Sequence, residues 1–114
     1  MNNVYNSLSV APNTPTVVNS IAGPVPPAGT NFNRASYRFK GLYIWSEIDC
    51  DVTVTRNVTV IGGGRISGAV QTLFLDFHSS PYDLMNGDVL TVQVTTADLI
   101  NSHIVRSTIL VEQL

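Results

Sequence analysis

Apolar and polar residues alternate along most of the chain after residue 35. In GLYIWSEIDCDVTVTRNVTV, residues 41–60, the even positions are apolar, namely Leu42, Ile44, Ile48, Cys50, Val52, Val54, Val58 and Val60. A period of two places alternate side chains on one face of a β-strand, and Val and Thr favour that conformation. Because one strand is usually much shorter than this stretch, it predicts two or three strands, with a turn, bulge or edge at Arg56–Asn57.

The alternation continues toward the C-terminus. Residues 70–77, 88–96 and 104–114 each carry an inward-facing set, namely Leu73, Leu75, Phe77, Leu90, Val92, Val94, Val105, Ile109 and Val111. Gly62-Gly63-Gly64 indicates a flexible loop, and Asn86-Gly87 a tight turn. Residues 95–103 favour one helical turn, with Thr96 or Asp98 as its cap. Since no longer segment shows a helical period, we expect an all-β chain, an antiparallel β-sandwich or jelly roll of about 7–8 short strands.

One strand is apolar on both phases. In RASYRFKGLYIWSEIDCD, residues 34–51, the aromatic residues occupy odd positions while the aliphatic residues fill even ones; the aromatic residues are Tyr37, Phe39, Tyr43 and Trp45. Gly41 stands between the two patterns. Either Gly41 marks a bulge that exchanges the two faces, or the strand has two apolar faces and something covers the second.

The stretch PNTPTVVNSIAGPVPPAGTNFN, residues 12–33, contains no charge and is rich in proline. Proline blocks helix and weakens strand ladders, so most of the stretch is expected to be extended, with TVVNSI as a short edge strand. We therefore expect an extended N-terminal arm over residues 1–33 and a sandwich over residues 34–114. An uncharged extended segment buries little of itself, so it needs a groove on its own domain or on a neighbour.

Composition narrows the possible partners. Charged residues make up 12% of the chain and the net charge is −2, which argues against nucleic acid because phosphate binding needs clustered Lys and Arg. The basic residues are scattered, at Arg34, Arg38, Lys40, Arg56, Arg65 and Arg106. Cys50 is the lone cysteine, which excludes an internal disulfide and a thiolate metal cluster. No signal-peptide pattern and no membrane-spanning apolar run is recognised.

Two clusters contain residue types that enzymes use in catalysis, but their arrangement does not match that of an active site. Glu47, Asp49 and Asp51 share one strand face at a spacing that glycosidase carboxylates use, yet a solvated outer face is favoured. Asp76 and His78 precede Ser79, Ser80 and Asp83, but no nucleophile elbow accompanies them. His103 belongs to no zinc-binding pair, and the glycine-rich IGGGRISG lacks the lysine of a phosphate loop. We predict no enzyme activity, no cofactor and no metal site.

The stretch SPYDLMNGDVLTV, residues 80–92, has the form of a sandwich corner. Tyr82 precedes a polar turn, Leu84 tucks under it, and Asp83 or Asp88 bonds the amides of the turn. Together with the uncharged arm, low charge and lone cysteine, this corner resembles the capsid decoration (cement) and minor structural proteins of tailed bacteriophages. The resemblance implies a non-enzymatic virion protein on the capsid exterior that binds the major capsid protein and itself, as a trimer or dimer.

The expected contact residues lie in the arm and in the aromatic strand: Val4, Tyr5, Leu8, Val10, Val17, Val18, Ile21, Tyr37, Phe39, Tyr43 and Trp45. An alternative is a carbohydrate-binding module of a tail fibre or adhesin. It would use Trp45 and Tyr43 as stacking platforms, with Glu47 and Asp49 as hydrogen-bond acceptors. A tail or neck adaptor is a further alternative.

Overall fold

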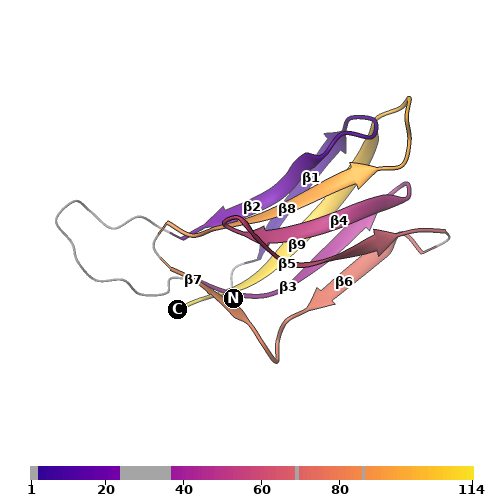
Figure 1. Ribbon diagram of the computed structural model, residues 1–114. Helices are drawn as coiled ribbons and strands as arrows, with labels where there is room; N and C mark the ends of the chain where they lie inside the picture. The colour runs from indigo at the N-terminus through magenta and orange to yellow at the C-terminus, as the bar shows by residue number, and fades with distance from the viewer. Residues whose placement is uncertain (1–2, 24–36, 69, 86) are drawn as a thin grey trace.

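The protein is a β-sandwich, seen here in a computed structural model that describes residues 3–23, 37–68, 70–85 and 87–114 (Figure 1). These residues form nine antiparallel strands in two packed sheets and contain no helix. The strands are β1 (Val4–Val10), β2 (Thr16–Ala22), β3 (Tyr37–Ser46), β4 (Cys50–Arg56), β5 (Thr59–Ile66), β6 (Thr72–Asp76), β7 (Tyr82–Leu84), β8 (Val89–Thr96) and β9 (His103–Gln113). The expected all-β sandwich is confirmed.

The first sheet has the order β1-β9-β3-β6, and β7 pairs with the start of β3. The second sheet has the order β2-β8-β4-β5. Four connections, β1–β2, β3–β4, β5–β6 and β8–β9, lie at the end of the molecule away from both termini (Figure 1). None of the described residues forms a helix long and apolar enough to cross a bilayer.

The core follows the alternation in the sequence. The inward-facing residues expected at Leu90, Val92, Val94, Val105, Ile109 and Val111 are all fully buried, as are Leu42, Ile44, Cys50 and Val54. The alternation ends at the expected turn, where Asn57 has a φ of 57° and Val58 is 96% exposed. A register shift between Val54 and Thr55 accompanies the change of phase.

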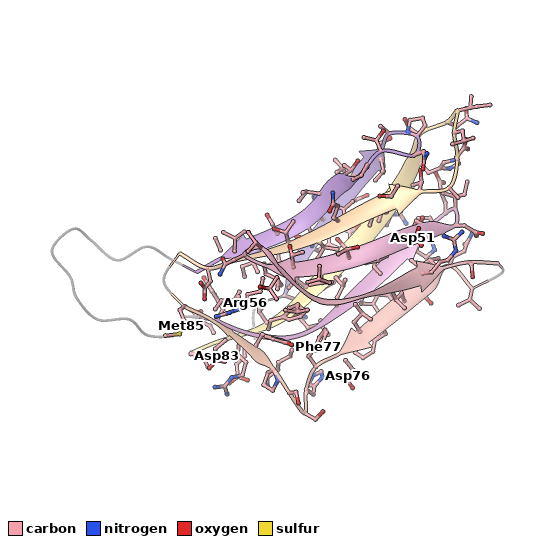
Figure 2. The ribbon with its side chains drawn as sticks, in the orientation of Figure 1. Asp51, Arg56, Asp76, Phe77, Asp83 and Met85 are labelled. Carbon is pink, nitrogen blue, oxygen red and sulfur yellow. The ribbon has the colours of Figure 1, made fainter. Side chains whose placement is uncertain are left out.

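The three glycines lie in strand β5, so the expected loop at residues 62–64 is wrong. A Cβ atom on Gly62 would stand 2.8 Å from Cζ of Phe77, and one on Gly64 would stand 3.0 Å from Cδ2 of Leu73. Phe77 follows β6 in the opposite sheet (Figure 2) and packs on Phe39 with a ring-centroid distance of 5.2 Å. The two sheets therefore approach closely at this edge, and a Cβ atom at Gly62 or Gly64 would crowd these side chains.

The described part of the expected arm belongs to the sandwich. β1 pairs with β9 along its whole length, and β2 pairs with β8 as the edge of the second sheet. The expected edge strand at TVVNSI is confirmed. The expected boundary between arm and sandwich at residue 33 differs from the structure, because residues 4–22 form strands of the two sheets. The physical reason is that Val10 and Val18 are buried in the common core. Residues 24–33 of the expected arm lie outside the described residues.

Residues 97–102 connect β8 to β9 without the expected helical turn. Oδ1 of Asp98 accepts hydrogen bonds from the backbone N–H groups of Ile100 and Asn101, at 2.8 and 3.0 Å. Asp98 thus caps a non-helical turn, because an Asp side chain bonds nearby amides equally well in a loop.

Candidate functional site

A bulge in β3 decides which aromatic side chains reach the surface. The pairing of β3 with β9 shifts register between Phe39 and Gly41, so the first of the two alternatives for Gly41 is confirmed. Before the shift, Phe39 points into the core; after it, Leu42 and Ile44 do. Because neighbouring residues of a strand alternate in direction, Tyr43 and Trp45 point outward from the first sheet.

Aromatic side chains from three strands line up across this outer face. Tyr43 lies directly opposite Phe74 on β6 and Thr108 on β9, and Thr108 lies opposite Tyr5 on β1. Tyr5 is 62% exposed, Tyr43 47% and Phe74 49%. The Tyr43 and Phe74 rings are tilted, with centroids 6.3 Å apart. We call Tyr5, Tyr43, Trp45 and Phe74 the aromatic face.

Trp45 is half-buried on the same face because an arginine covers its ring. Cζ of Arg106, from β9, stands 5.0 Å from the ring centroid, within the range of a cation–π contact. A groove of about 260 Å³ runs beside this pair, lined by Tyr5, Tyr43, Trp45, Arg106, Ser107 and Thr108. The groove can take an apolar or ring-shaped group and offers one guanidinium and the Thr108 hydroxyl as polar partners.

A second groove, of about 330 Å³, follows the edge where β1 and β2 lie side by side. It is lined by Val4, Tyr5, Asn6, Val17, Val18, Asn19 and Ser20. Nδ2 of Asn6 donates to the Val18 carbonyl at 2.7 Å, and Nδ2 of Asn19 donates to the Val4 carbonyl at 2.9 Å. These amides join the edge strands of the two sheets. Tyr5 lines both grooves.

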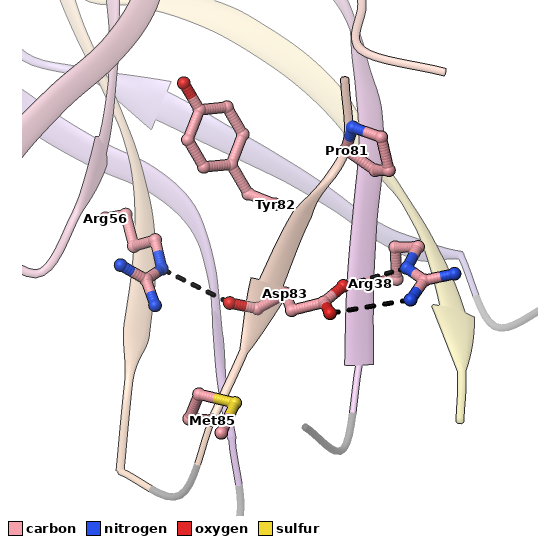
Figure 3. A pocket seen from close by; sticks show the side chains of 6 residues that line it. All are labelled: Arg38, Arg56, Pro81, Tyr82, Asp83 and Met85. Carbon is pink, nitrogen blue, oxygen red and sulfur yellow. Dashed lines mark hydrogen bonds and ion pairs between the residues drawn. The ribbon is translucent and has the colours of Figure 1, made fainter. Parts of the chain in front are cut away.

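A third hollow, of about 410 Å³, lies at the corner after β6 and is lined by Arg38, Arg56, Pro81, Tyr82, Asp83 and Met85 (Figure 3). Nε of Arg38 donates to Oδ1 of Asp83 at 2.8 Å, and this hydrogen bond lowers the pKa of Asp83 below its usual value. Nε of Arg56 donates to the Asp83 carbonyl at 3.3 Å. The two guanidinium groups hold the corner from opposite sides.

The corner itself has the form expected from the sequence. Leu84 is fully buried, and Oδ2 of Asp88 accepts from the backbone N–H of Met85 at 2.9 Å. Nη2 of Arg56 also lies 2.9 Å from Oδ2 of Asp88. Since both arginines contact carboxylates, the hollow is better explained as a supported corner than as an anion site.

The contact residues expected from the sequence separate into three groups. Val10, Val18 and Phe39 are buried, and Val4, Leu8, Ile21 and Tyr37 pack against the core; neither group is presented to a partner as an exposed side chain. Tyr5, Val17 and Tyr43 are exposed and Trp45 is half-buried. Sequence reasoning missed Phe74 and Arg106. The signal for Phe74 was present, because it is an aromatic residue on the polar phase of β6.

Glu47, Asp49 and Asp51 do not act together, and their expected common face is wrong. Oε1 of Glu47 accepts from the backbone N–H of Ile104 at 2.8 Å, which lowers the pKa of Glu47. Oδ1 of Asp49 accepts from the amide of Gly68 at 3.1 Å. Asp51 pairs with Arg65 across β4 and β5. β3 ends at Ser46 and β4 begins at Cys50, so Glu47 and Asp49 lie in the connection between the strands and the three carboxylates contact different partners.

The two histidines each contact carboxylates. Nδ1 of His78 lies 2.5 Å from Oδ1 of Asp76 at an exposed turn. Nε2 of His103 lies 2.6 Å from Oδ2 of Asp98, and its Nδ1 lies 3.2 Å from Oε1 of Glu47. The hydrogen bond to Asp98 raises the pKa of His103. In the described residues no three His, Cys, Asp or Glu side chains are placed to hold a metal ion.

The fold and this surface define a β-sandwich whose first sheet carries an exposed aromatic face. Compared with known proteins, the chain matches no protein-family model, no curated protein and no solved structure. Its function must therefore be inferred from its own residues.

Proposed function

We propose that this protein is a non-enzymatic virion structural protein that decorates and stabilises a tailed-bacteriophage capsid, binding the major capsid protein and itself. The observation that supports a binding role is the row of Tyr5, Tyr43 and Phe74 across the outer face of the first sheet. The capsid as the partner, and the virion exterior as the location, rest on the resemblance in the sequence.

An aromatic row of this kind suits a protein partner. Tyr, Trp and Phe are enriched at protein interfaces because they bury a large area and lose few rotatable bonds. The rings here come from β1, β3 and β6, so the packed sheet holds them in place before binding. A preformed surface reduces the ordering cost of association.

Co-sedimentation with capsids assembled from the major capsid protein of the same genome tests the proposal. The wild-type chain is expected to sediment with the capsids, and Tyr43→Ser/Phe74→Ser is expected to weaken binding at least about tenfold, as for interface hot spots. Val58→Ser is the matched control, because Val58 is an exposed apolar residue at the β4–β5 turn of the other sheet. No binding by the wild type, or equal binding by both variants, would overturn the proposal.

Carbohydrate binding is the second candidate, and the groove beside Tyr43 and Trp45 favours it. Against it, Arg106 covers the Trp45 ring, and the acceptors expected of Glu47 and Asp49 are bonded to backbone amides. Quenching of Trp45 fluorescence by acrylamide distinguishes the candidates. In a carbohydrate-binding module, added oligosaccharides would protect Trp45 from acrylamide. In a decoration protein, only added capsids would protect Trp45. An adaptor would respond to tail or neck proteins instead.

A further inference from the structure

The outer edge of the first sheet lacks the features that usually prevent strand addition. This edge is β1, with the sequence VYNSLSV, which contains neither charge nor proline. β1 pairs with β9 over all seven residues without a register shift, so the strand has no bulge. Exposed regular edges of this type are templates for another strand, and proteins normally block them with charges, prolines or bulges.

The other edges of the described sandwich carry such features. β2 shifts register against β8 between Val17 and Asn19. β5 carries Arg65 and three glycines, and its ladder with β4 is also shifted. β6 has only five residues and ends at Asp76. The contrast makes β1 the edge best suited to strand pairing.

β1 is complementary to a second copy of itself. Two β1 strands that overlap fully in antiparallel orientation place Val4 opposite Val10 and Ser7 opposite Ser7 of the other copy. The residue numbers of each opposite pair then sum to an even value, so both members lie on the same face of the sheet. Tyr5, Ser7 and Ser9 stay on the outer face of both copies, and the inward-facing residues stay on the inner face.

The surface beside β1 also suits a second copy. The groove between β1 and β2 is lined by seven residues, and none of them is charged. Tyr5 and Val17, which are 62% and 51% exposed, supply apolar surface at its rim. A two-fold dimer places identical patches together, so an uncharged, partly apolar edge avoids the repulsion that a charged edge would cause.

We propose that two copies of this chain pair through β1 in antiparallel orientation, about a two-fold axis at Ser7. The inference rests on the self-association in the proposed function and specifies its strand and symmetry. The first sheets of the two copies then form one continuous sheet, and the two aromatic faces form one surface. Because both β1 edges are used up, the assembly closes as a dimer.

Charge reversal at the two-fold axis tests this pairing. Ser7→Lys and Ser7→Glu each place like charges opposite each other, so each variant alone is expected to be a monomer. An equimolar mixture is expected to recover a heterodimer, since Lys then faces Glu. Thr72→Lys is the matched control, because Thr72 is exposed on the outer face at the opposite edge. Native mass spectrometry and light scattering read the mass, and thermal melting verifies the fold.

The wild type is expected at twice the chain mass of 12.3 kDa in the micromolar range. A wild-type monomer or trimer, a dimer insensitive to both charges at Ser7, or a mixture that stays monomeric would overturn the pairing. Capsid binding is measured separately with Tyr43→Ser/Phe74→Ser. A dimer that does not bind capsids overturns capsid decoration and leaves the β1 pairing standing. A monomer that binds capsids overturns the β1 pairing and the self-association, and leaves capsid decoration standing.

Discussion

At the residue scale, Asn19 joins the two sheets from inside. Its side chain is buried, and Nδ2 donates to the Val4 carbonyl of β1 at 2.9 Å and to Oγ of Ser107 of β9 at 3.1 Å. Its Oδ1 accepts from the backbone N–H of Ser20 at 2.9 Å. A polar residue in the core is thus satisfied by three partners, which is the usual condition for its burial.

We expect Asn19→Leu to lower the free energy of unfolding by about 1–3 kcal/mol, because it leaves the partners of Asn19 buried without their hydrogen bonds. Urea denaturation followed by circular dichroism measures the change. Ser102→Ala, in the exposed β8–β9 connection, is the control and is expected to change stability by less than about 0.5 kcal/mol. Equal stability of Asn19→Leu and the wild type would contradict the bridging role.

Gly62 faces the ring of Phe77, and aromatic neighbours hold that ring on both sides. The Phe77 ring packs on Phe39 and, with centroids 5.7 Å apart, on Tyr82, so it cannot move away from a new Cβ atom. Gly62→Ala is expected to destabilise the fold by about 1–3 kcal/mol through overpacking. In a Phe77→Leu background the cost should shrink, and a double-mutant cycle by denaturation measures this coupling. Additive effects would contradict the close approach.

At the scale of elements, His103 connects two of the loops at one end of the sandwich. It lies at the start of β9 between Asp98, in the β8–β9 connection, and Glu47, at the end of β3. Ala97 adds a backbone hydrogen bond to the Asp49 carbonyl at 2.9 Å. Both ring nitrogens face carboxylates, so the arrangement favours the doubly protonated imidazolium. Arg106 also acts on Glu47 and lowers its pKa.

The stability that His103 contributes should depend on pH. Its pKa is raised in the folded protein above the usual histidine value of 6.5, so the contribution is complete below about pH 6.5 and is lost as pH rises through the folded pKa. Asp98, whose pKa is lowered, contributes above its unfolded pKa and loses that contribution in acid.

We therefore expect the melting temperature of the wild type to fall as pH rises above 6.5, relative to His103→Gln. His78→Gln is the control that removes the other histidine and keeps the Asp98–His103–Glu47 cluster. A titration of His103 by NMR gives the pKa directly. A value at or below 6.5, or the same pH profile for His103→Gln and the wild type, would contradict the role of this cluster.

Features that depend on the alternation within one strand could be predicted from the sequence, whereas features that depend on contacts between distant strands could not. Val52, Val54, Val92 and Val94 alternate within their own strands, so their burial was predictable. The glycines of β5 lie in a strand because they pair with β4, and Phe77 and Leu73 face Gly62 and Gly64 from the other sheet. The aromatic face was predictable at Tyr43 and Trp45, where both phases are apolar. Its alignment with Tyr5 and Phe74 was not, because it depends on the register of strands far apart in sequence.

At the scale of the whole molecule, the N-terminal strands complete both sheets. β1 supplies one edge of the first sheet and β2 one edge of the second, and each contributes a fully buried valine to the core. Burying Val10 and Val18 contributes about 3–6 kcal/mol together. A domain of ordinary stability has about 5–15 kcal/mol in total. Residues 4–22 therefore belong to the folding unit, although their composition is that of a connector.

A chain that starts at Asn33 lacks both strands, and we expect it not to fold. Its truncated sheets would expose Val92, Val94 and Val105 to water, and the Asn19 bridge to Ser107 would be gone. Circular dichroism and proton NMR should show an unfolded or aggregated chain, and a peptide of residues 1–23 added in trans should restore a dispersed spectrum. The control is a chain that starts at Asn3, which keeps both strands and is expected to melt like the wild type. A folded monomer from the chain starting at Asn33 would show that β1 and β2 are an appendage.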